Sequence, residues 1–244
     1  MIGALAFLTI LGRGRRPDAS HQPWFPFVGA AIGALVGLVW WGASQWWPSL
    51  VAGALAVVAD LVVTGLLHLD GLADSADGLL PHMDRARRLA VMSAPDTGAF
   101  AVATVAAVLL LRWAALGANT LDGSHIVAAC AGLWALSRGV MVVAMNVLPY
   151  ARAEVGLGSA FAGSRSAART TLLCLLGGSL GVTGLILGRG ALHGVITAVA
   201  ALVAGVGVLA LGRRRLGGYT GDVLGAAGVM CETVGLLVLC ASTR

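Results

Sequence analysis

The stretch LHGVITAVAALVAGVGVLAL, residues 192–211, contains no acidic residue and no arginine or lysine. Its length matches the roughly 20 apolar residues that an α-helix needs to cross a lipid bilayer. Comparable apolar stretches recur along the whole chain. They predict six or seven membrane-spanning helices, at about residues 27–47, 50–67, 98–118, 125–148, 171–187, 192–211 and 221–241.

The composition requires most of the protein surface to face lipid. Of the 244 residues, 58% are hydrophobic and only 11% are charged, and the mean hydropathy is +0.90. A soluble domain carries about a quarter charged residues, so this chain could not cover a surface that faces water. We therefore expect an all-α, polytopic transmembrane bundle that forms a single domain over residues 1–244 and is surrounded by membrane lipid.

The arginines predict how the bundle is oriented. All 16 basic residues are arginine, and twelve of them fall in cytoplasmic segments if the N-terminus is cytoplasmic, as the positive-inside rule requires. This orientation places residues 68–97, 149–170 and 212–222 on one face. We therefore expect a polar active site on the cytoplasmic side of a bacterial cell membrane. The first eleven residues are expected to form a short interfacial or re-entrant helix.

The remaining composition limits the kinds of partner. The sequence pI is about 9.7, but the basic residues are few and scattered among apolar runs. Anionic lipid headgroups and phosphorylated substrates are therefore the expected partners, and nucleic acid is not. The four cysteines show no paired spacing, so neither a disulfide framework nor a zinc site is indicated. The oligomeric state stays open, a homo-oligomer included.

The segment HLDGLADSADG, residues 68–78, carries the strongest local chemical signal. Asp70, Asp74 and Asp77 are spaced by four and three residues, so they would project from one face of a helix. Like charges this close repel each other, and the arrangement is costly unless a cation compensates. Carboxylate oxygens suit Mg²⁺, with Mn²⁺ as an alternative ion. The segment therefore predicts a metal site, and a solvated acidic loop is the alternative.

A second acidic region lies in GGYTGDVLGAA, residues 217–227, with a further acid beyond it. Asp222 begins the last predicted span, and Glu232 would lie about 15 Å deeper along a regular helix. A carboxylate at that depth must face the protein interior or a polar cavity. Glu232 is therefore either part of the site or a partner in a hydrogen bond between helices.

Two arginines and one aspartate near the spans also need partners. Arg138 lies inside the fourth span, where it requires an anion: a carboxylate of this protein or a substrate phosphate. Arg152 follows that span and could reach a nucleotide from the surface. Asp60, midway along the second span, is either a buried hydrogen-bond partner or part of a cavity.

Several residues around the aspartate segment have two interpretations each. Arg85, Arg87 and Arg88 would bind either a phosphate or only lipid headgroups. His68 would be a metal ligand or, more simply, a residue that orients the aspartates. Gly98, directly before the third span, indicates a close approach of the backbone to another group.

Four blocks in this order resemble the cobalamin synthase family, the adenosylcobinamide-GDP ribazoletransferases of bacterial vitamin B12 assembly. They are HLDGLADSADG (68–78), SRG (137–139), YAR…E…GLG (150–158) and TGDVLGA (220–226), and the resemblance extends over essentially the whole chain. Three departures stand out. MSAPDTG at residues 92–98 replaces a segment that usually reads M-R-D-S-R-x-G, Val229 replaces a glutamate, and Val155 resembles an insertion.

The resemblance implies a transferase that moves cobinamide-phosphate from adenosylcobinamide-GDP to α-ribazole or its 5′-phosphate, with GMP as leaving group. It implies a Mg²⁺ or Mn²⁺ site formed by Asp70, Asp74, Asp77, Asp222 and Glu232. One of the four aspartates would accept the proton of the attacking hydroxyl. The residues implied in substrate binding are His68, Gly71, Gly78, Gly98, Arg138, Arg152, Glu154, Thr220 and Gly221.

Two other functions compete with this interpretation. A CDP-alcohol phosphotransferase of phospholipid synthesis gathers aspartates in the same way, but its usual D-x2-D-G-x2-A-R pattern is not found in this sequence. A transporter of small solutes or ions would use Asp60, Arg138 and Glu232 as a path through the membrane. Against a transporter, the acids concentrate on one side and the sequence shows no inverted repeat.

Overall fold

The computed structural model describes residues 1–12, 18–152 and 167–241, and the described chain is almost entirely helical. No β-strand occurs in these ranges; a single isolated bridge joins Tyr150 and Tyr219. The all-α prediction is therefore confirmed. In chain order the elements are α1 (Ile2–Leu8), the 3-10 helix η1 (Ala19–Trp24), α2 (Phe25–Ser44), α3 (Ser49–Thr64), α4 (Leu67–Leu79), α5 (Arg85–Val91), α6 (Ala99–Gly117), α7 (Gly123–Val147), α8 (Ala167–Arg189), α9 (Ala191–Leu216) and α10 (Gly221–Cys240).

Each predicted span corresponds to a helix, although not every helix could cross a membrane alone. Among the described residues, five helical segments are long and apolar enough: η1 with α2, then α6, α7, α9 and α10. The pair α3 and α4 counts as a sixth only if its bend of 91° is accepted within one span, and the apolar part of α8, Cys174–Arg189, is shorter. The structure thus supports a polytopic bundle with five to six spans, where the sequence predicts six or seven.

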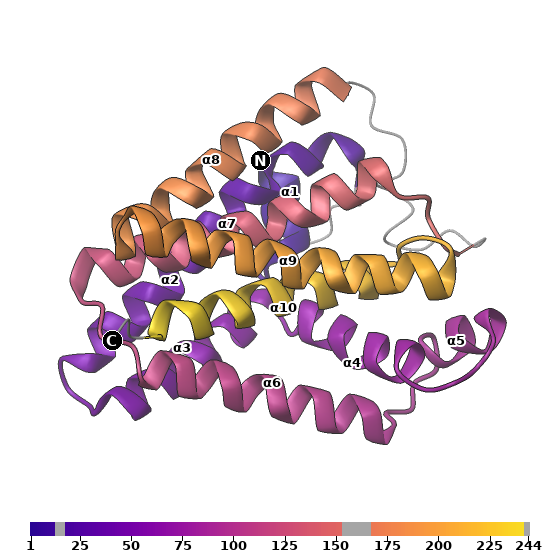
Figure 1. The fold of residues 1–244 in the computed structure, drawn as a ribbon, viewed down its shortest axis with the longest axis horizontal. Helices are drawn as coiled ribbons and strands as arrows, with labels where there is room; N and C mark the ends of the chain where they lie inside the picture. The colour runs from indigo at the N-terminus through magenta and orange to yellow at the C-terminus, as the bar shows by residue number, and fades with distance from the viewer. Residues whose placement is uncertain (13–17, 153–166, 242–244) are drawn as a thin grey trace.

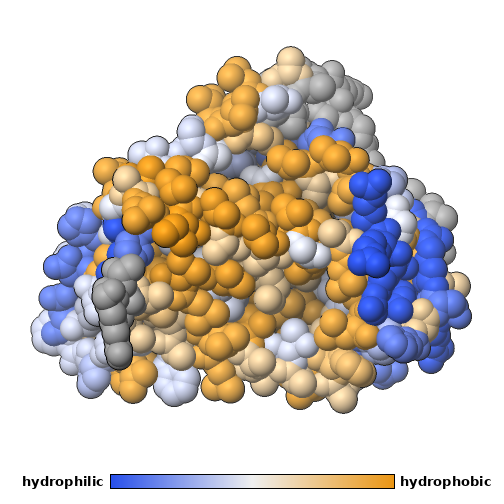
Figure 2. Space-filling model, viewed as in Figure 1, coloured by the Kyte–Doolittle hydropathy of each residue, from blue (hydrophilic) through white to orange (hydrophobic). Residues whose placement is uncertain are grey.

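The long helices lie side by side, and charged segments collect at the ends of the bundle. In Figure 1, α4, α5, the start of α6 and the end of α9 lie at the right, whereas the α6–α7 and α8–α9 connections lie at the left. Figure 2 shows hydrophobic surface across the middle of this view and hydrophilic surface at both ends. Helix α10 packs against α9, α4, α7 and α6, and α7 packs against α2 and α8, so α7 and α10 form the centre.

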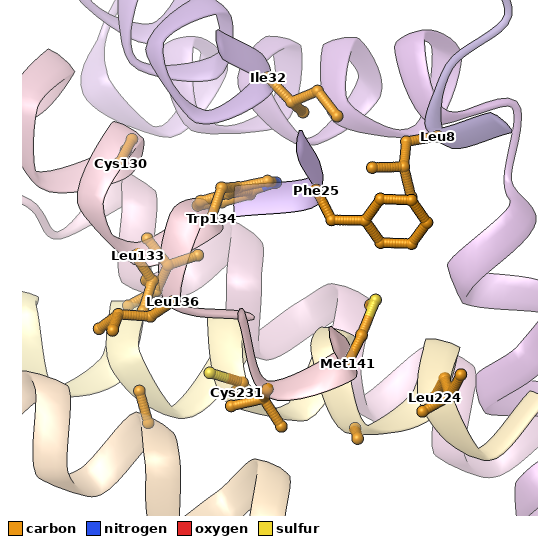
Figure 3. Packing of buried hydrophobic residues seen from close by; sticks show 14 of the residues in the cluster. Leu8, Phe25, Ile32, Cys130, Leu133, Trp134, Leu136, Met141, Leu224 and Cys231 are labelled. Atoms are coloured by element: carbon orange, nitrogen blue, oxygen red, sulfur yellow. The ribbon is translucent and has the colours of Figure 1, made fainter. Parts of the chain in front are cut away.

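The core of the bundle contains two buried tryptophans, Trp40 and Trp134, and many small residues. Trp134 of α7 is fully buried, beside Ile32 of α2 and Leu133 (Figure 3). Helices α2 and α7 approach closely because a Cβ at Gly33 would lie only 2.2 Å from the carbonyl oxygen of Cys130. Close backbone approach of this kind is how helices associate in lipid, where the hydrophobic effect does not drive their pairing.

The break between α3 and α4 sets the direction of α4, the helix that carries the aspartates. Gly65 ends α3 in the left-handed conformation (φ 58°), and its N–H donates to the carbonyls of Leu61 and Val62. Leu66 follows with φ 63°, and it is the one residue other than glycine with positive φ among those described. A left-handed leucine costs about 1–2 kcal/mol. This strain accompanies a turn of 91° that directs α4 along the first turns of α10.

Candidate active site

Helix α4 presents its three aspartates in three different environments. Asp70 is exposed, Asp74 is partly buried and Asp77 is buried. In the described part of the chain, the Asp70 and Asp74 carboxylates make no hydrogen bond or ion pair with the protein. These two carboxylates are therefore available to an external cation.

Asp77 has a structural partner, because its carboxylate caps the N-terminus of α6. Its Oδ2 accepts a hydrogen bond from the Gly98 N–H at 2.6 Å, and its Oδ1 accepts one from the Ala101 N–H at 2.9 Å. A side-chain acceptor normally comes from the residue before the helix, but Gly98 has none. A Cβ at Gly98 would lie 2.7 Å from Asp77 Oδ1. The close approach predicted for Gly98 is thus an approach to Asp77.

The start of α10 brings a fourth aspartate beside α4. Thr220 caps α10 by accepting a hydrogen bond from the Val223 N–H at 3.2 Å, and its hydroxyl lies 3.3 Å from Asp222 Oδ2. The helices touch where a Cβ at Gly71 would lie 2.8 Å from the Asp222 carbonyl oxygen. Gly225 likewise faces His68. Two segments that lie far apart in the sequence, 68–78 and 220–225, therefore form one site.

A short backbone pairing places an arginine at this site. The Tyr219 N–H donates to the Pro149 carbonyl at 2.9 Å, and the Ala151 N–H donates to the Tyr219 carbonyl at 2.8 Å. Arg152 follows directly and donates from Nη2 to Asp222 Oδ2 at 2.7 Å. It also donates from Nη1 to the Ser93 hydroxyl at 2.6 Å. About a quarter of its side chain is exposed (26%), so part of the guanidinium still faces the site.

The charges at this site do not balance within the described residues. Asp74 experiences repulsion from the carboxylates of Asp222, Asp70 and Asp77, and its attraction to Arg152 offsets only part of it. Asp222 is also repelled by Asp70, but its attraction to Arg152 is the larger effect. Adjacent carboxylates are stabilised when a cation lies between them. The arrangement can therefore bind a cation together with the anionic groups that the cation attracts.

The two tyrosines of the pairing add no negative charge to the site. Burial, with a smaller contribution from Tyr150, raises the pKa of Tyr219 to about 12. Burial also raises the pKa of Tyr150, against the opposing effect of Arg152. Both phenols therefore stay protonated at neutral pH. Their rings pack edge to face, 5.4 Å apart between centroids, and this contact reinforces the backbone pairing.

Glu232 lies in a separate, fully buried network of ion pairs. Its Oε2 accepts a hydrogen bond from Arg112 at 3.1 Å, while its Oε1 accepts one from the Ser137 hydroxyl at 2.7 Å and another from Arg138. Arg112 also donates to Asp60 at 2.9 Å. Two arginines thus balance two carboxylates, and the network joins α3, α6, α7 and α10.

This network shows which partners Arg138, Asp60 and Glu232 have, which the sequence alone leaves open. The anionic partner of Arg138 is Glu232, and Arg138 is only 1% exposed, so no free face remains for a phosphate. Asp60 is a buried hydrogen-bond partner that also accepts from the Trp134 indole N–H at 2.9 Å. The metal-ligand role predicted for Glu232 finds no support in this geometry. Glu232 is buried, and the two guanidinium groups that pair with it would repel a metal cation.

Two of the three arginines of α5, Arg85 and Arg88, donate to backbone carbonyl groups of other segments. Arg85 donates to the carbonyls of Leu216 and Ala151, at 2.7 and 2.8 Å. Arg88 is buried and donates to the carbonyl of Gly78 at 2.7 Å. These two side chains tie α5 to the end of α4 and to the α9–α10 connection. They therefore stabilise the frame around the aspartates.

The other residues implied in substrate binding fall into two groups. Thr220 and Gly221 adjoin Asp222, and a Cβ at Gly221 would meet no other atom within 4 Å. Gly78 lies away from Asp222 and packs on Met92, because its Cβ would come within 2.2 Å of Met92 Cγ. Glu154 lies outside the described residues.

A cavity of about 170 Å³ opens beside the aspartates. Asp70, Asp222 and His68 line it together with Gly221 and Gly225, and its other walls are the apolar side chains of Phe7, Phe25, Leu67, Met141, Met145 and Leu224. Figure 3 shows the Phe25 and Met141 side chains extending toward one another. His68 is buried, and its Nδ1 has no hydrogen-bond partner in the described structure.

The residues fit a metal ion only in part. Over residues 1–12, 18–152 and 167–241, no three His, Cys, Asp or Glu side chains lie close enough together to hold an ion by themselves. Within the described part of the chain Asp70 and Asp74 have no partner, Asp222 is paired with Arg152, and Asp77 accepts hydrogen bonds from the start of α6. Mg²⁺ is usually bound by one or two carboxylates plus water and substrate phosphate, so this donor set suits an ion that arrives with its substrate.

Arg112 is the residue whose importance the sequence analysis missed. A sequence signal for its role in the buried network was its position inside an apolar span, because an arginine there needs an anionic partner. Asp60 and Glu232 are the matching acids on other spans. The sequence alone did not show that these three residues would meet.

The chain is similar to known proteins along nearly its whole length. The family model described as cobalamin-5-phosphate synthase matches residues 1–240. Proteins named adenosylcobinamide-GDP ribazoletransferase are 36% identical to this chain in three bacteria. In Chlorobium phaeovibrioides the match spans 236 residues (95% of this chain, 93% of the relative), in Leptothrix cholodnii 241 residues (92% and 86%), and in Escherichia coli 243 residues (96% of each).

No solved structure matches the chain. The family model extends over nearly the whole sequence, and the relatives are matched along almost their full length. The CDP-alcohol phosphotransferase and transporter alternatives are not the family that matches. The chain belongs to the cobalamin-5-phosphate synthase family.

Proposed function

We propose that this protein joins the two halves of a cobamide by displacement at phosphorus. A ribose hydroxyl of α-ribazole, or of its 5′-phosphate, attacks the phosphorus of adenosylcobinamide-GDP that bears the cobinamide. The new O–P bond forms as the bond to GMP breaks, and the hydroxyl proton passes to a base. The observation that carries this proposal is that Asp70, Asp74 and Asp222 gather at one end of the bundle, where Asp70 and Asp74 have no partner among the described residues.

The acidic side chains would bind the diphosphate through a divalent cation. Asp70 and Asp74 are the candidate ligands, with Asp222 as a third, and Mg²⁺ is the ion that such oxygens and a diphosphate favour. Such an ion would supply positive charge that offsets the negative charge developing on phosphate during the displacement. Asp77 would act only indirectly, by fixing α4 to α6 through its two backbone hydrogen bonds.

Arg152 would bind the departing phosphate. Its guanidinium is held by Asp222 and Ser93, so it is already oriented before substrate arrives. A charged donor fixed in this way favours an anion that appears during the reaction. Phosphate that binds Arg152 would compete with Asp222 for the guanidinium N–H groups, and Asp222 would then be free to accept the hydroxyl proton. Thus one contact couples binding of the leaving group to the availability of a base.

The membrane orientation is part of the same proposal. Because the arginine distribution favours a cytoplasmic N-terminus, we place the aspartates of α4 and the start of α10 on the cytoplasmic side of a bacterial cell membrane. Nucleotide substrates and Mg²⁺ are supplied on that side.

The decisive test is turnover by the purified protein in lipid nanodiscs. With Mg²⁺, adenosylcobinamide-GDP and α-ribazole 5′-phosphate, we expect stoichiometric release of GMP, followed by chromatography. Release should stop when Mg²⁺ is chelated and should resume when it is restored. GMP release that persists in the presence of a chelator would refute the metal assignment. Turnover of a CDP-alcohol, with no GMP release from the cobinamide donor, would refute the substrate assignment.

A further inference from the structure

The cavity beside Asp70 and Asp222 has walls of two chemical kinds. Its inner surface is apolar, formed by two phenylalanines, two methionines and two leucines: Phe7, Phe25, Met141, Met145, Leu67 and Leu224. At the aspartates it becomes acidic. Such a cavity suits a ligand with a flat apolar part and a polar part attached to it, because each part would meet matching surface.

The volume of the cavity limits the size of the apolar part of its ligand. Apolar cavities of about 150 Å³ hold a single aromatic ring such as benzene, and this cavity measures about 170 Å³. Pockets for drug-sized ligands are larger, about 300–1,000 Å³. A corrin macrocycle is therefore excluded from this cavity. A small planar heterocycle fits.

His68 supplies one polar contact in the cavity wall. Its side chain is more than nine-tenths buried, and its Nδ1 has no partner within the described chain. Buried polar atoms without a partner are uncommon, and a missing ligand is one explanation for them. A neutral imidazole nitrogen can donate or accept a single hydrogen bond, depending on the tautomer. One ring nitrogen of a bound heterocycle would satisfy it.

We infer that this cavity is the subsite for the heterocyclic base of the acceptor substrate. It takes the weakly polar heterocycle of α-ribazole, and His68 forms a hydrogen bond with a ring nitrogen of that heterocycle. This inference rests on the proposed function. The ribose attached to the base then lies at the mouth of the cavity, beside Asp70 and Asp222, where its hydroxyl must be to attack phosphorus.

Guanine of the donor is the other flat base in the reaction, and it suits the cavity less well. Guanine carries several donors and acceptors along its edges, whereas the apolar walls offer partners for few of them. Each buried polar group left unpaired lowers affinity by about tenfold. The guanosine part of the donor therefore binds outside this cavity.

Two matched substitutions test the subsite by its volume. Met145 lines the cavity and is 5% exposed, so Met145→Trp fills the space; Val206→Trp places the same side chain on α9, at a position that is 55% exposed and does not line this cavity. Met145→Trp should raise the KM for α-ribazole 5′-phosphate by about tenfold or more, with the KM for the cobinamide donor within about twofold. Val206→Trp should change neither. An unchanged acceptor KM in folded Met145→Trp protein overturns the inference.

A second test uses the hydrogen bond and does not depend on overpacking. Benzimidazole should inhibit competitively against the acceptor, and it should bind about fivefold to tenfold more tightly than indene, which has the same shape without nitrogen. His68→Leu should abolish this preference, and His68→Asn, which keeps a polar atom near Nδ1, should restore part of it. Benzimidazole that competes with the donor, or a preference that survives His68→Leu, overturns the inference.

Failure of the inference is distinguishable from failure of the proposed function. If the wild-type protein releases no GMP from any combination of substrates, the proposed function fails. Calorimetric titration of wild-type and Met145→Trp protein with benzimidazole then still reports on the cavity. Binding to the wild type alone supports a heterocycle site, and equal or absent binding overturns it.

Discussion

Replacing Glu232 by glutamine tests whether this residue holds the bundle together or binds metal. The substitution keeps the shape of the side chain and removes its charge. In the wild type, Glu232 is 1% exposed and accepts hydrogen bonds from Arg112, Arg138 and Ser137. In Glu232→Gln protein, two buried guanidinium groups would share the single carboxylate of Asp60.

The expected cost follows from this loss of balance. Removing one partner from a buried ion pair destabilises a protein by about 3–5 kcal/mol, because the remaining charge stays buried and uncompensated. For a chain of this length, each kcal/mol lowers the Tm by about 2–4 °C, so Glu232→Gln should lower it by about 10 °C. The Mg²⁺ concentration needed for half-maximal turnover should not change.

The assay measures thermal unfolding in nanodiscs of fixed lipid composition, with tryptophan fluorescence as the signal. Steady-state GMP release is measured on the same protein. The double variant Glu232→Gln/Arg138→Gln removes one charge of each sign and leaves the Arg112–Asp60 pair intact. It should therefore be more stable than Glu232→Gln alone, which is the coupling expected of residues in one network. An unchanged Tm with a raised Mg²⁺ requirement would refute this reasoning and restore Glu232 as a metal ligand.

Three further predictions concern the aspartates and Arg152. Asp74→Asn should abolish GMP release while the protein still inserts and keeps its Tm, whereas Asp122→Asn, at an exposed position, should retain full turnover; normal activity of Asp74→Asn would contradict the assignment. Asp77→Ala should lower the Tm by a few degrees, since loss of a helix cap costs about 0.5–2 kcal/mol, and total loss of turnover with an unchanged Tm would instead make it a metal ligand. Arg152→Ala should raise the donor KM about tenfold, since a hydrogen bond to a charged group contributes about 1.5–3 kcal/mol, with the acceptor KM unchanged in the same assay.

The spans and the aspartate helix were predictable because each depends on local pattern. Apolar runs of sufficient length specify helices in lipid without reference to distant residues. Every predicted run overlaps a helix, although the run 50–67 is interrupted by the bend between α3 and α4. The spacing of Asp70, Asp74 and Asp77 likewise specifies one helical face. The blocks at residues 68–78 and 220–226 were expected to lie near each other because the arginine distribution places both regions on one face and because they resemble one family. The structure brings them into contact.

The rest depended on contacts between distant residues. Nothing local shows that Asp77 would cap α6, although Gly98 hinted at a close approach. The bend that shortens α3 requires a left-handed Leu66, and leucine gives no sequence signal for that conformation. The pairing of Arg112 with Asp60 and Glu232 joins three helices, so no single stretch of sequence encodes it.

The acidic residues divide into those that the protein neutralises and those that it leaves for a ligand. Asp60 and Glu232 are balanced by arginines in the membrane interior, and Asp77 is satisfied by the backbone of α6. The same fold supplies no partner to Asp70 and Asp74 in the part of the chain that it describes. Since repulsion between these carboxylates is costly, leaving them unpaired makes physical sense only if a substrate completes the balance. The reaction should therefore occur where the protein has not cancelled its own charge.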